Sequence, residues 1–260
     1  MDYNEELQLG KHLLDLAKRE IMKYYQTELK VEVKPDQSPL TIADKKAEEI
    51  MRRVIDEHTP SYSVIGEECG GKLGETPHQW VIDPIDGTKS FIHGVPLFGT
   101  LLALLKDGEP VMGLIGFPAL NITVWAVKEQ GCFIDDAPCR VSQIGDLPGA
   151  TLLDGSATTM ENMGLAKPWR ELRSKSLLAR GWGDCFGYLL VASGRAEVMV
   201  DPIVEIWDMA PMAVIIPEAG GTFTSLKGGD YLSDRSGLAT NGLLHQEVVD
   251  TFAPYFNTQG

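Results

Sequence analysis

The sequence lacks any hydrophobic run long enough to cross a membrane, which would need roughly 20 apolar residues in a row. It also lacks a C-x-x-C pair, so neither a zinc knuckle nor a thioredoxin-type redox motif is supported. The start of the chain is acidic and has no basic signal-peptide segment. We therefore expect no membrane partner, a cytoplasmic location, and free thiols at Cys69, Cys132, Cys139 and Cys185.

Positive charge is also scarce in this chain. The 260 residues include 23 Lys and Arg against 37 Asp and Glu, which gives a formal net charge of -14. Such a surface repels the phosphate backbone of nucleic acids, so we expect no nucleic-acid partner. A phosphate-bearing substrate would need local positive charge, and bound metal ions are one source of it.

The composition is that of an ordinary globular chain, with 43% hydrophobic and 23% charged residues, which excludes the disordered and collagen-like classes. In the first part, apolar spacing predicts a helix over residues 5–28 and a second helix capped by Thr41. Strands are predicted at 63–66, 79–83, 97–105, 111–117 and 122–127. We expect Pro84 to stop the second of these strands.

After about residue 145 the pattern changes to alternating strands and helices. It predicts strands at 150–154, 197–201 and 222–225, and helices near Trp169, over 184–193 and over 207–219. We therefore predict an α/β fold with two subdomains. Residues 1–145 would form an α+β part and residues 146–260 an α/β part.

Acidic residues end several predicted strands and open predicted helices. The run WVIDPIDGTKSF places Asp83 and Asp86 directly after a buried strand, and Glu67 ends the strand before it. Asp44 and Asp208 each lie near the start of a helix. Taken singly, each residue fits a turn or a helix cap better than a functional role. Taken together, such hard oxygen ligands suit Mg²⁺ or Mn²⁺, because buried carboxylates are costly without a cation between them.

The motifs GEE, WVIDPIDGTKSF and WDMA, in this order, resemble those of the inositol monophosphatase-like family of metal-dependent phosphatases. TIAD at 41–44 and EAGG at 218–221 extend the match. The resemblance implies a layered αβαβα sandwich, a homodimer, and a requirement for two or three Mg²⁺ ions, for which Mn²⁺ is a possible substitute. It also implies an enzyme, a phosphoric monoester hydrolase.

The resemblance further implies a ligand set. Glu67, Asp83 and the backbone carbonyl of Ile85 would hold a first metal ion. Asp83, Asp86 and Asp208 would hold a second one. In such sites two cations clamp the attacking and leaving oxygens of an in-line displacement. This arrangement would explain why two aspartates follow a buried strand.

Catalytic roles follow from the same resemblance, and they fall to Asp44, Glu67 and Thr88. A water activated by the first metal would attack the phosphate. Thr88 would orient this water, and Asp44 would accept its proton through the Thr88 hydroxyl. The amides of Gly87 and Thr88, which open a short predicted helical turn, would bind the phosphate oxygens.

The substrate is predicted from the stretch ARGWGDCFGYLLVASGRAEVMVDP, which resembles the histidinol-phosphate phosphatases of this family. Histidinol phosphate carries an ammonium group and an imidazole. Asp184 and Asp201 would supply the opposite charge, and Trp182 would pack on the imidazole. Each of the three has an alternative role. Trp182 could be a core residue, Asp184 could cap the helix that follows, and Asp201 could hydrogen-bond a polyol. We assign no role to Lys89, His93, Arg180 and Arg195.

Two other functions remain open at this point. The first is hydrolysis of another small phosphomonoester, with inositol 1-phosphate as the leading candidate. The second is a metal-binding interaction protein without catalysis, although a mere cation buffer would not need Asp44 and Thr88. Phosphate release with and without Mg²⁺ separates the two classes.

Overall fold

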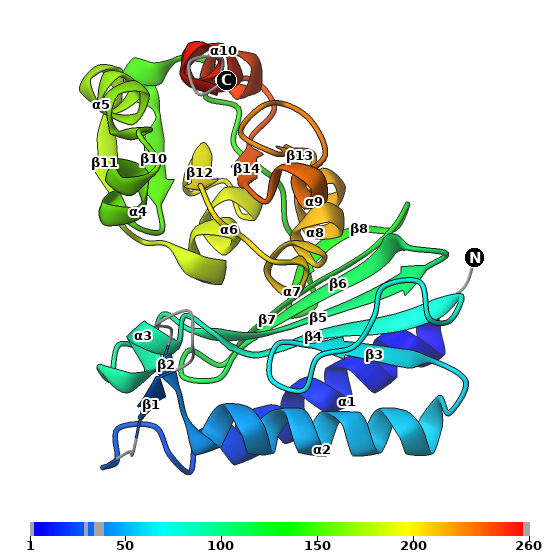
Figure 1. The fold of residues 1–260 in the computed structure, drawn as a ribbon. Coiled ribbons are helices and arrows are strands. Elements are labelled where there is room, and N and C mark those ends of the chain that lie inside the picture. Colours follow the sequence, from blue (N-terminus) through cyan, green and yellow to red (C-terminus); the bar gives the residue numbers. More distant parts are fainter. Residues whose placement is uncertain (1–2, 29–30, 34–38, 257–260) are drawn as a thin grey trace.

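Two β-sheets organise the chain, and helices cover and separate them (Figure 1). The computed structural model describes residues 3–28, 31–33 and 39–256. The larger sheet has seven strands, which follow one another in space in the order of the sequence. They are β3 (Ser63–Gly66), β4 (His78–Asp86), β5 (Gly99–Lys106), β6 (Glu109–Phe117), β7 (Ile122–Val127), β8 (Gly131–Ile134) and β9 (Ala137–Pro138).

The smaller sheet has five strands in the order β11-β10-β12-β14-β13. Their bounds are Leu178–Arg180, Thr151–Asp154, Val198–Asp201, Gly237–Thr240 and Thr222–Thr224, respectively. β10 runs parallel to both of its neighbours, whereas β14 runs antiparallel to both of its own. A separate short pair joins β1 (Glu32–Val33) and β2 (Pro39–Leu40).

Helices occupy three layers around these sheets (Figure 1). α1 (Asn4–Ile21) and α2 (Ile42–His58) cover one face of the larger sheet. The layer between the sheets contains α6 (Asp184–Ala192), α7 (Ile206–Met209) and α8 (Met212–Glu218). The outer face of the smaller sheet packs on α4 (Ala157–Asn162), α5 (Ala166–Lys175) and α10 (His245–Phe256). The predicted αβαβα sandwich is confirmed.

The layers are held by separate apolar clusters. Leu13 and Ile21 of α1 pack with Met51 of α2 against Trp80 of β4. Between the sheets, residues of α6 and α8 join those of β5, β6 and β7. A third cluster lies under α5 and α10. The layer between the sheets positions the candidate site, since it brings α6 and α7 against the end of β4.

Several predicted bounds are wrong. The first helix ends at Ile21 instead of residue 28, and Gln26 has a left-handed φ of 57° that no helix continues through. The predicted helix over 207–219 is split into α7 and α8, because Pro211 has no amide to donate at the junction. α10, β14, β8 and β11 were not predicted.

The strand expected to stop at Pro84 continues to Asp86. Pro84 is tolerated there because it lies in a bulge, where the ladder between β4 and β5 is interrupted. Its carbonyl still has a partner, since the Thr100 hydroxyl donates to it at 2.8 Å.

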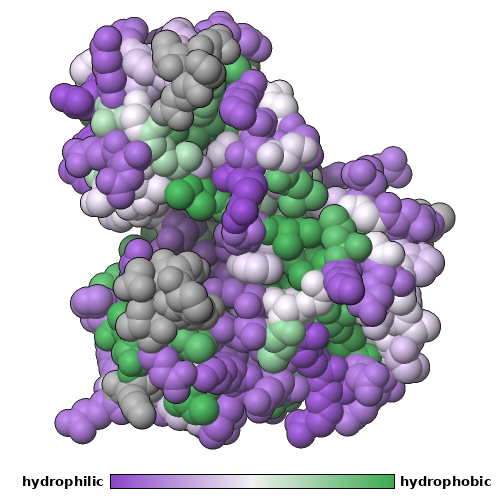
Figure 2. Space-filling model, in the orientation of Figure 1, coloured by the Kyte–Doolittle hydropathy of each residue, from purple (hydrophilic) through white to green (hydrophobic). Residues whose placement is uncertain are grey.

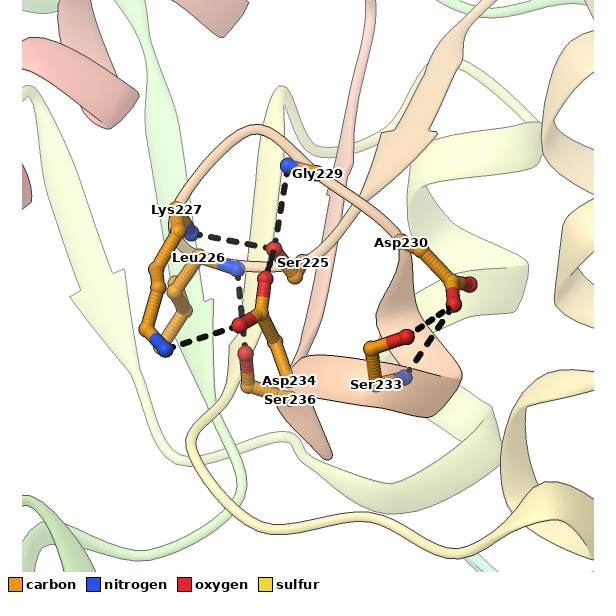
Figure 3. Close-up of polar contacts among 8 residues, drawn as sticks. All are labelled: Ser225, Leu226, Lys227, Gly229, Asp230, Ser233, Asp234 and Ser236. Atoms are coloured by element: carbon orange, nitrogen blue, oxygen red, sulfur yellow. Dashed lines mark hydrogen bonds and ion pairs between the residues drawn. The ribbon is translucent and has the colours of Figure 1, made fainter.

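A polar network fixes the connection from β13 to β14 (Figure 3). The Ser225 hydroxyl donates to Asp234 Oδ2 at 2.7 Å and accepts from the amides of Lys227 and Gly229. The ammonium of Lys227 pairs with Asp234 Oδ1 at 2.7 Å. The Leu226 amide donates to the Ser236 hydroxyl at 3.1 Å. This network therefore anchors the residue just before β14.

The predicted division at residues 145 and 146 lies between the last strand of the larger sheet and the first strand of the smaller one. The division into subdomains itself stays a prediction. All four cysteines are free, as expected. Among the described residues, none of the helices combines the length and the apolar character that a membrane crossing requires.

Candidate metal and phosphoester site

The bulge in β4 determines where its two aspartates point. Side chains alternate along a strand, so residues three apart normally face opposite sides of a sheet. From Asp83 to Asp86 the strand β4 advances three residues, while its partner β5 advances only two, from Leu101 to Gly99. The extra residue brings both aspartates to the same side. The carboxylates are therefore neighbours.

Asp208 completes this group from α7, in the middle layer. Carboxylate oxygens of Asp83, Asp86 and Asp208 all lie within 4.8 Å of one another. Asp208 also accepts a hydrogen bond from the Glu205 amide at 2.8 Å and so caps α7. One oxygen is enough for the cap, so the other oxygen is available to a metal ion.

The electrostatics of this cluster favour the binding of cations. Burial raises the pKa of Asp83 well above its usual range, and the nearby charges of Glu67, Asp86 and Asp208 raise it further. Burial also raises the pKa of Asp208 strongly and that of Asp86 to about 7. Divalent cations would relieve this repulsion. The oxygen ligands fit Mg²⁺ or Mn²⁺.

Glu67 and Ile85 lie beside the same carboxylates. Glu67 follows β3, and its amide donates to the Ile82 carbonyl of β4 at 3.1 Å. Its side chain is hydrogen-bonded with Asp83. Ile85 is fully buried in the bulge, and its amide donates to Asp83 Oδ1 at 2.9 Å. All five predicted metal-binding residues thus lie in one region.

The hydroxyl of Thr88 does not make the contact expected from the sequence. It donates to the Ile85 carbonyl at 2.9 Å, so its single proton is not given to Asp44. Asp44 caps α2 instead, where its Oδ2 accepts from the Thr41 amide at 2.8 Å and from the Thr41 hydroxyl at 2.6 Å. Asp44 Oδ1 is buried and has no hydrogen-bond partner among the described residues. Burial raises the pKa of Asp44 to about 6.

Gly87 joins β4 to the short helix α3 (Thr88–Ile92) with a φ of 81°, a conformation that favours glycine. Space is limited there as well. A Cβ at this position would lie 3.1 Å from both the Leu97 carbonyl and Asp184 Oδ2. The carboxylate of Asp184 is thus close to the turn that the sequence assigns to phosphate binding.

A cavity of about 530 Å³ opens next to the carboxylate cluster. In the space-filling view a recess at the left separates the upper and lower parts of the molecule (Figure 2). The cavity walls come from α3, the start of α4, the segment before α6 and the end of β12. They include Lys89, Ser90, Gly155, Ser156, Trp182, Asp184, Asp201, Ile203 and Asp208.

The three predicted substrate residues all line this cavity. Trp182 is 41% exposed, so it is not a core residue. Asp184 begins α6 with a left-handed φ of 52°, a costly conformation for a residue other than glycine. Asp201 ends β12. Burial, and then the charge of Asp184, raise the pKa of Asp201 to about 8.

Sequence reasoning missed other residues near the site. Lys89 lines the cavity, and its charge opposes the effect of burial on the pKa of Asp184. Tyr188 donates to Asp201 Oδ2 at 2.8 Å, and Cys185 donates its amide to Asp86 Oδ2. The sequence gives a partial signal, because Cys185 and Tyr188 belong to the WGDCFGY run. His93, Arg180 and Arg195 are exposed and do not line this cavity.

Comparisons with known proteins agree with this geometry. A model of the inositol monophosphatase family matches residues 3–256. A histidinol-phosphatase from Streptomyces coelicolor is 39% identical over 258 residues, which are 95% of this chain and 97% of that protein. One from Mycobacterium tuberculosis is 40% identical over 227 residues, or 85% and 87% of the two chains.

Solved structures give the same result. An inositol monophosphatase from Thermotoga maritima superposes with a TM-score of 0.90 at 27% identity, covering 98% of this chain and all of that one. The fold, the acidic cluster and the sequence matches are mutually consistent. The chain therefore belongs to the inositol monophosphatase family, and the prediction of a phosphoric monoester hydrolase is confirmed.

Proposed function

We propose that the protein hydrolyses L-histidinol phosphate to L-histidinol and inorganic phosphate, with Mg²⁺ as its cofactor. The observation that carries this proposal is the cavity beside the carboxylate cluster, whose walls combine Asp184 and Asp201 with the half-exposed ring of Trp182. An acidic wall favours a cationic leaving group. The relatives named histidinol-phosphatase support the same substrate.

In the proposed site, Glu67, Asp83, Asp86 and Asp208, together with the Ile85 carbonyl, hold the cations. When bound, Mg²⁺ supplies positive charge that polarises the phosphoester and makes a nearby water more acidic. The protein contributes the fixed positions of these oxygens. Buried surroundings also keep competing water away from the reacting phosphate.

Proton handling is proposed for Thr88 and Asp44. The Thr88 hydroxyl can both donate and accept, as a group that orients a water molecule must. Asp44 keeps one buried oxygen without a hydrogen-bond partner among the described residues, so it has a vacant acceptor position. The amides of Gly87 and Thr88 donate to the phosphate oxygens in this proposal.

Binding of the leaving group is proposed for the three cavity residues. Asp184 and Asp201 attract the ammonium group, and Trp182 packs against the imidazole. Lys89 balances part of the negative charge near the phosphate turn. We further propose a homodimer and a cytoplasmic location. The first proposal depends on the family resemblance and the second on the free thiols.

The test is a comparison of kcat/KM for histidinol phosphate and inositol 1-phosphate in the presence of Mg²⁺. We expect at least a tenfold preference for histidinol phosphate, and a loss of activity with a chelator. Asp201→Asn should reduce the preference, whereas Asp136→Asn, in the exposed turn before β9, should not. A tenfold preference for inositol 1-phosphate would refute the substrate and leave the phosphatase activity intact.

A further inference from the structure

The buried hydroxyl of Tyr188 holds one oxygen of Asp201. Tyr188 lies in the middle of α6 and is only 1% exposed. Its hydroxyl donates to Asp201 Oδ2 at 2.8 Å, and the sulfur of Met209 lies 3.6 Å from the same hydroxyl. A buried tyrosine hydroxyl needs a partner, and a carboxylate is among the strongest that it can find.

Two glycines leave space for the Tyr188 hydroxyl and for the Asp201 carboxylate. Gly237 of β14 pairs with Asp201 of β12, and a Cβ at Gly237 would lie 2.7 Å from the Tyr188 hydroxyl. A Cβ at Gly155, just after β10, would lie 2.3 Å from Asp201 Oδ1. The network in Figure 3 anchors Ser236, the residue before Gly237. The orientation of the Asp201 carboxylate is thus constrained from both sides.

The second oxygen of Asp201 is left for another partner. Within the described part of the chain, Oδ2 has the Tyr188 hydroxyl and Oδ1 has no hydrogen bond. Oδ1 lies against Gly155, and both residues line the cavity of about 530 Å³. A carboxylate whose rotation is restricted loses less conformational freedom when it binds a ligand.

We infer that Tyr188 is a positioning residue for leaving-group specificity, because its hydroxyl fixes Asp201 so that Oδ1 faces a cationic group in the cavity. The inference rests on the proposed function, since it concerns the ammonium of the leaving alcohol. Tyr188 touches neither the phosphate nor the predicted metal ligands in this account. Its effect should therefore appear in substrate preference rather than in the chemical step.

The test uses two esters that differ in one group, 2-aminoethyl phosphate and 2-hydroxyethyl phosphate. The first contains the ammonium-bearing part of histidinol phosphate, and the second replaces the ammonium with a hydroxyl. In Tyr188→Phe, the ratio of kcat/KM for the amino ester to that for the hydroxy ester should fall about tenfold, as for one lost hydrogen bond to a charged group. The change should lie in KM, with kcat for the amino ester retained.

A matched control is available in Tyr62→Phe. The Tyr62 hydroxyl donates to Glu6 Oε1 at 2.9 Å, so this variant also removes a tyrosine hydroxyl from a carboxylate, but outside the cavity. We expect no change in the ratio for the control. Gly155→Ala probes Asp201 from the other side with Tyr188 intact, and it should lower the ratio in the same direction.

A double-mutant cycle separates positioning from a merely structural role. In an Asp201→Asn background, Tyr188→Phe should no longer change the ratio, because its effect acts through that carboxylate. Equal losses for both esters, or the same loss in both backgrounds, would overturn the inference. Failure of the proposed function is a different result, since it would appear in the unaltered protein as a preference for inositol 1-phosphate.

Discussion

The carboxylate cluster and the cavity beside it are built in different ways. Most of the cluster comes from one short segment, Asp83 to Thr88, at the end of a buried strand. The cavity draws on the ends of β10 and β12, the segment before α6, and α3. The predicted metal site thus takes three of its five residues, Asp83, Ile85 and Asp86, from one segment and adds Glu67 and Asp208 from elsewhere, whereas the cavity walls are dispersed over several elements. The dispersed part can change residue by residue while the reaction centre remains intact.

The largest effect should come from Asp83→Asn. Asp83 is 2% exposed and close to Glu67, Asp86 and Asp208, and in the predicted ligand set it is shared by both metal ions. Turnover with Mg²⁺ should fall at least about 10³-fold, because several kcal/mol of transition-state stabilisation are lost. Circular dichroism should remain that of the folded protein. Normal activity in this variant would contradict the ligand assignment.

The next largest effect is expected for Thr88→Ala. Loss of the hydroxyl should lower kcat by roughly 10²-fold, the range for a positioned acid–base element. Thr88→Ser retains the hydroxyl and is the matched control, which should keep most of the activity. If alanine and serine variants behave alike in steady-state assays, then the hydroxyl has no part in the reaction.

Changes in the cavity should be smaller and should depend on the substrate. Trp182→Ala removes the ring proposed to pack on the imidazole, so KM for histidinol phosphate should rise by roughly 3- to 10-fold, the value of a partly exposed cation–π contact. Trp182→Phe should restore part of the affinity. For 2-aminoethyl phosphate, which has no imidazole, the rise should be weaker; an equal rise for both esters would exclude the stacking role.

The smallest predicted effect concerns stability and pH. Burial raises the pKa of Asp86 to about 7 and of Asp201 to about 8, compared with roughly 3.9 for a free aspartate. Between about pH 4 and pH 8 the folded, metal-free protein therefore binds more protons than the unfolded chain, so its stability should fall as the pH rises. Cations bind the deprotonated carboxylates, so Mg²⁺ should stabilise more at high pH.

Thermal unfolding with Mg²⁺ or with a chelator measures this difference. We expect the Tm increase with Mg²⁺ to be a few degrees larger at pH 8 than at pH 5.5, since about 1 kcal/mol shifts Tm by roughly 2–4 °C in a chain of this size. The dependence should be weakened in Asp83→Asn. An increase that is constant with pH, or greater at pH 5.5, would show that these carboxylates do not bind the ion.

Much of the fold could be predicted from the sequence, because apolar spacing reflects burial directly. The periodicity of Leu9, Leu13 and Ala17 marks α1, and the apolar runs mark β5 to β7. β14 was missed because GLAT is short and contains little alternation. α10 contains Pro254, which obscures its helical pattern. The split between α7 and α8 was missed although Pro211, which has no amide to donate, is visible in the sequence at the junction.

The candidate site was predictable to the extent that it is local. The residue types from Asp83 to Thr88 suggested a cation site, but only the bulge puts the two carboxylates on the same side. The hydrogen bond of Tyr188 with Asp201 connects α6 to β12, and no spacing rule encodes it. Whether the Thr88 hydroxyl donates to Asp44 or to the Ile85 carbonyl likewise depends on distances that a sequence does not specify.

The bulge in β4 has a consequence for how this segment can vary through evolution. Removing one of the two residues between the aspartates would leave both carboxylates on the same side by regular alternation, but it would abolish the bulge. The contacts made there by Ile85, whose amide donates to Asp83 and whose carbonyl accepts from Thr88, would then be disrupted. Substitution of Pro84 would preserve the spacing, whereas a one-codon deletion would remove this local geometry. Homologous genes should therefore show a fixed length across these positions even where the intervening residues differ.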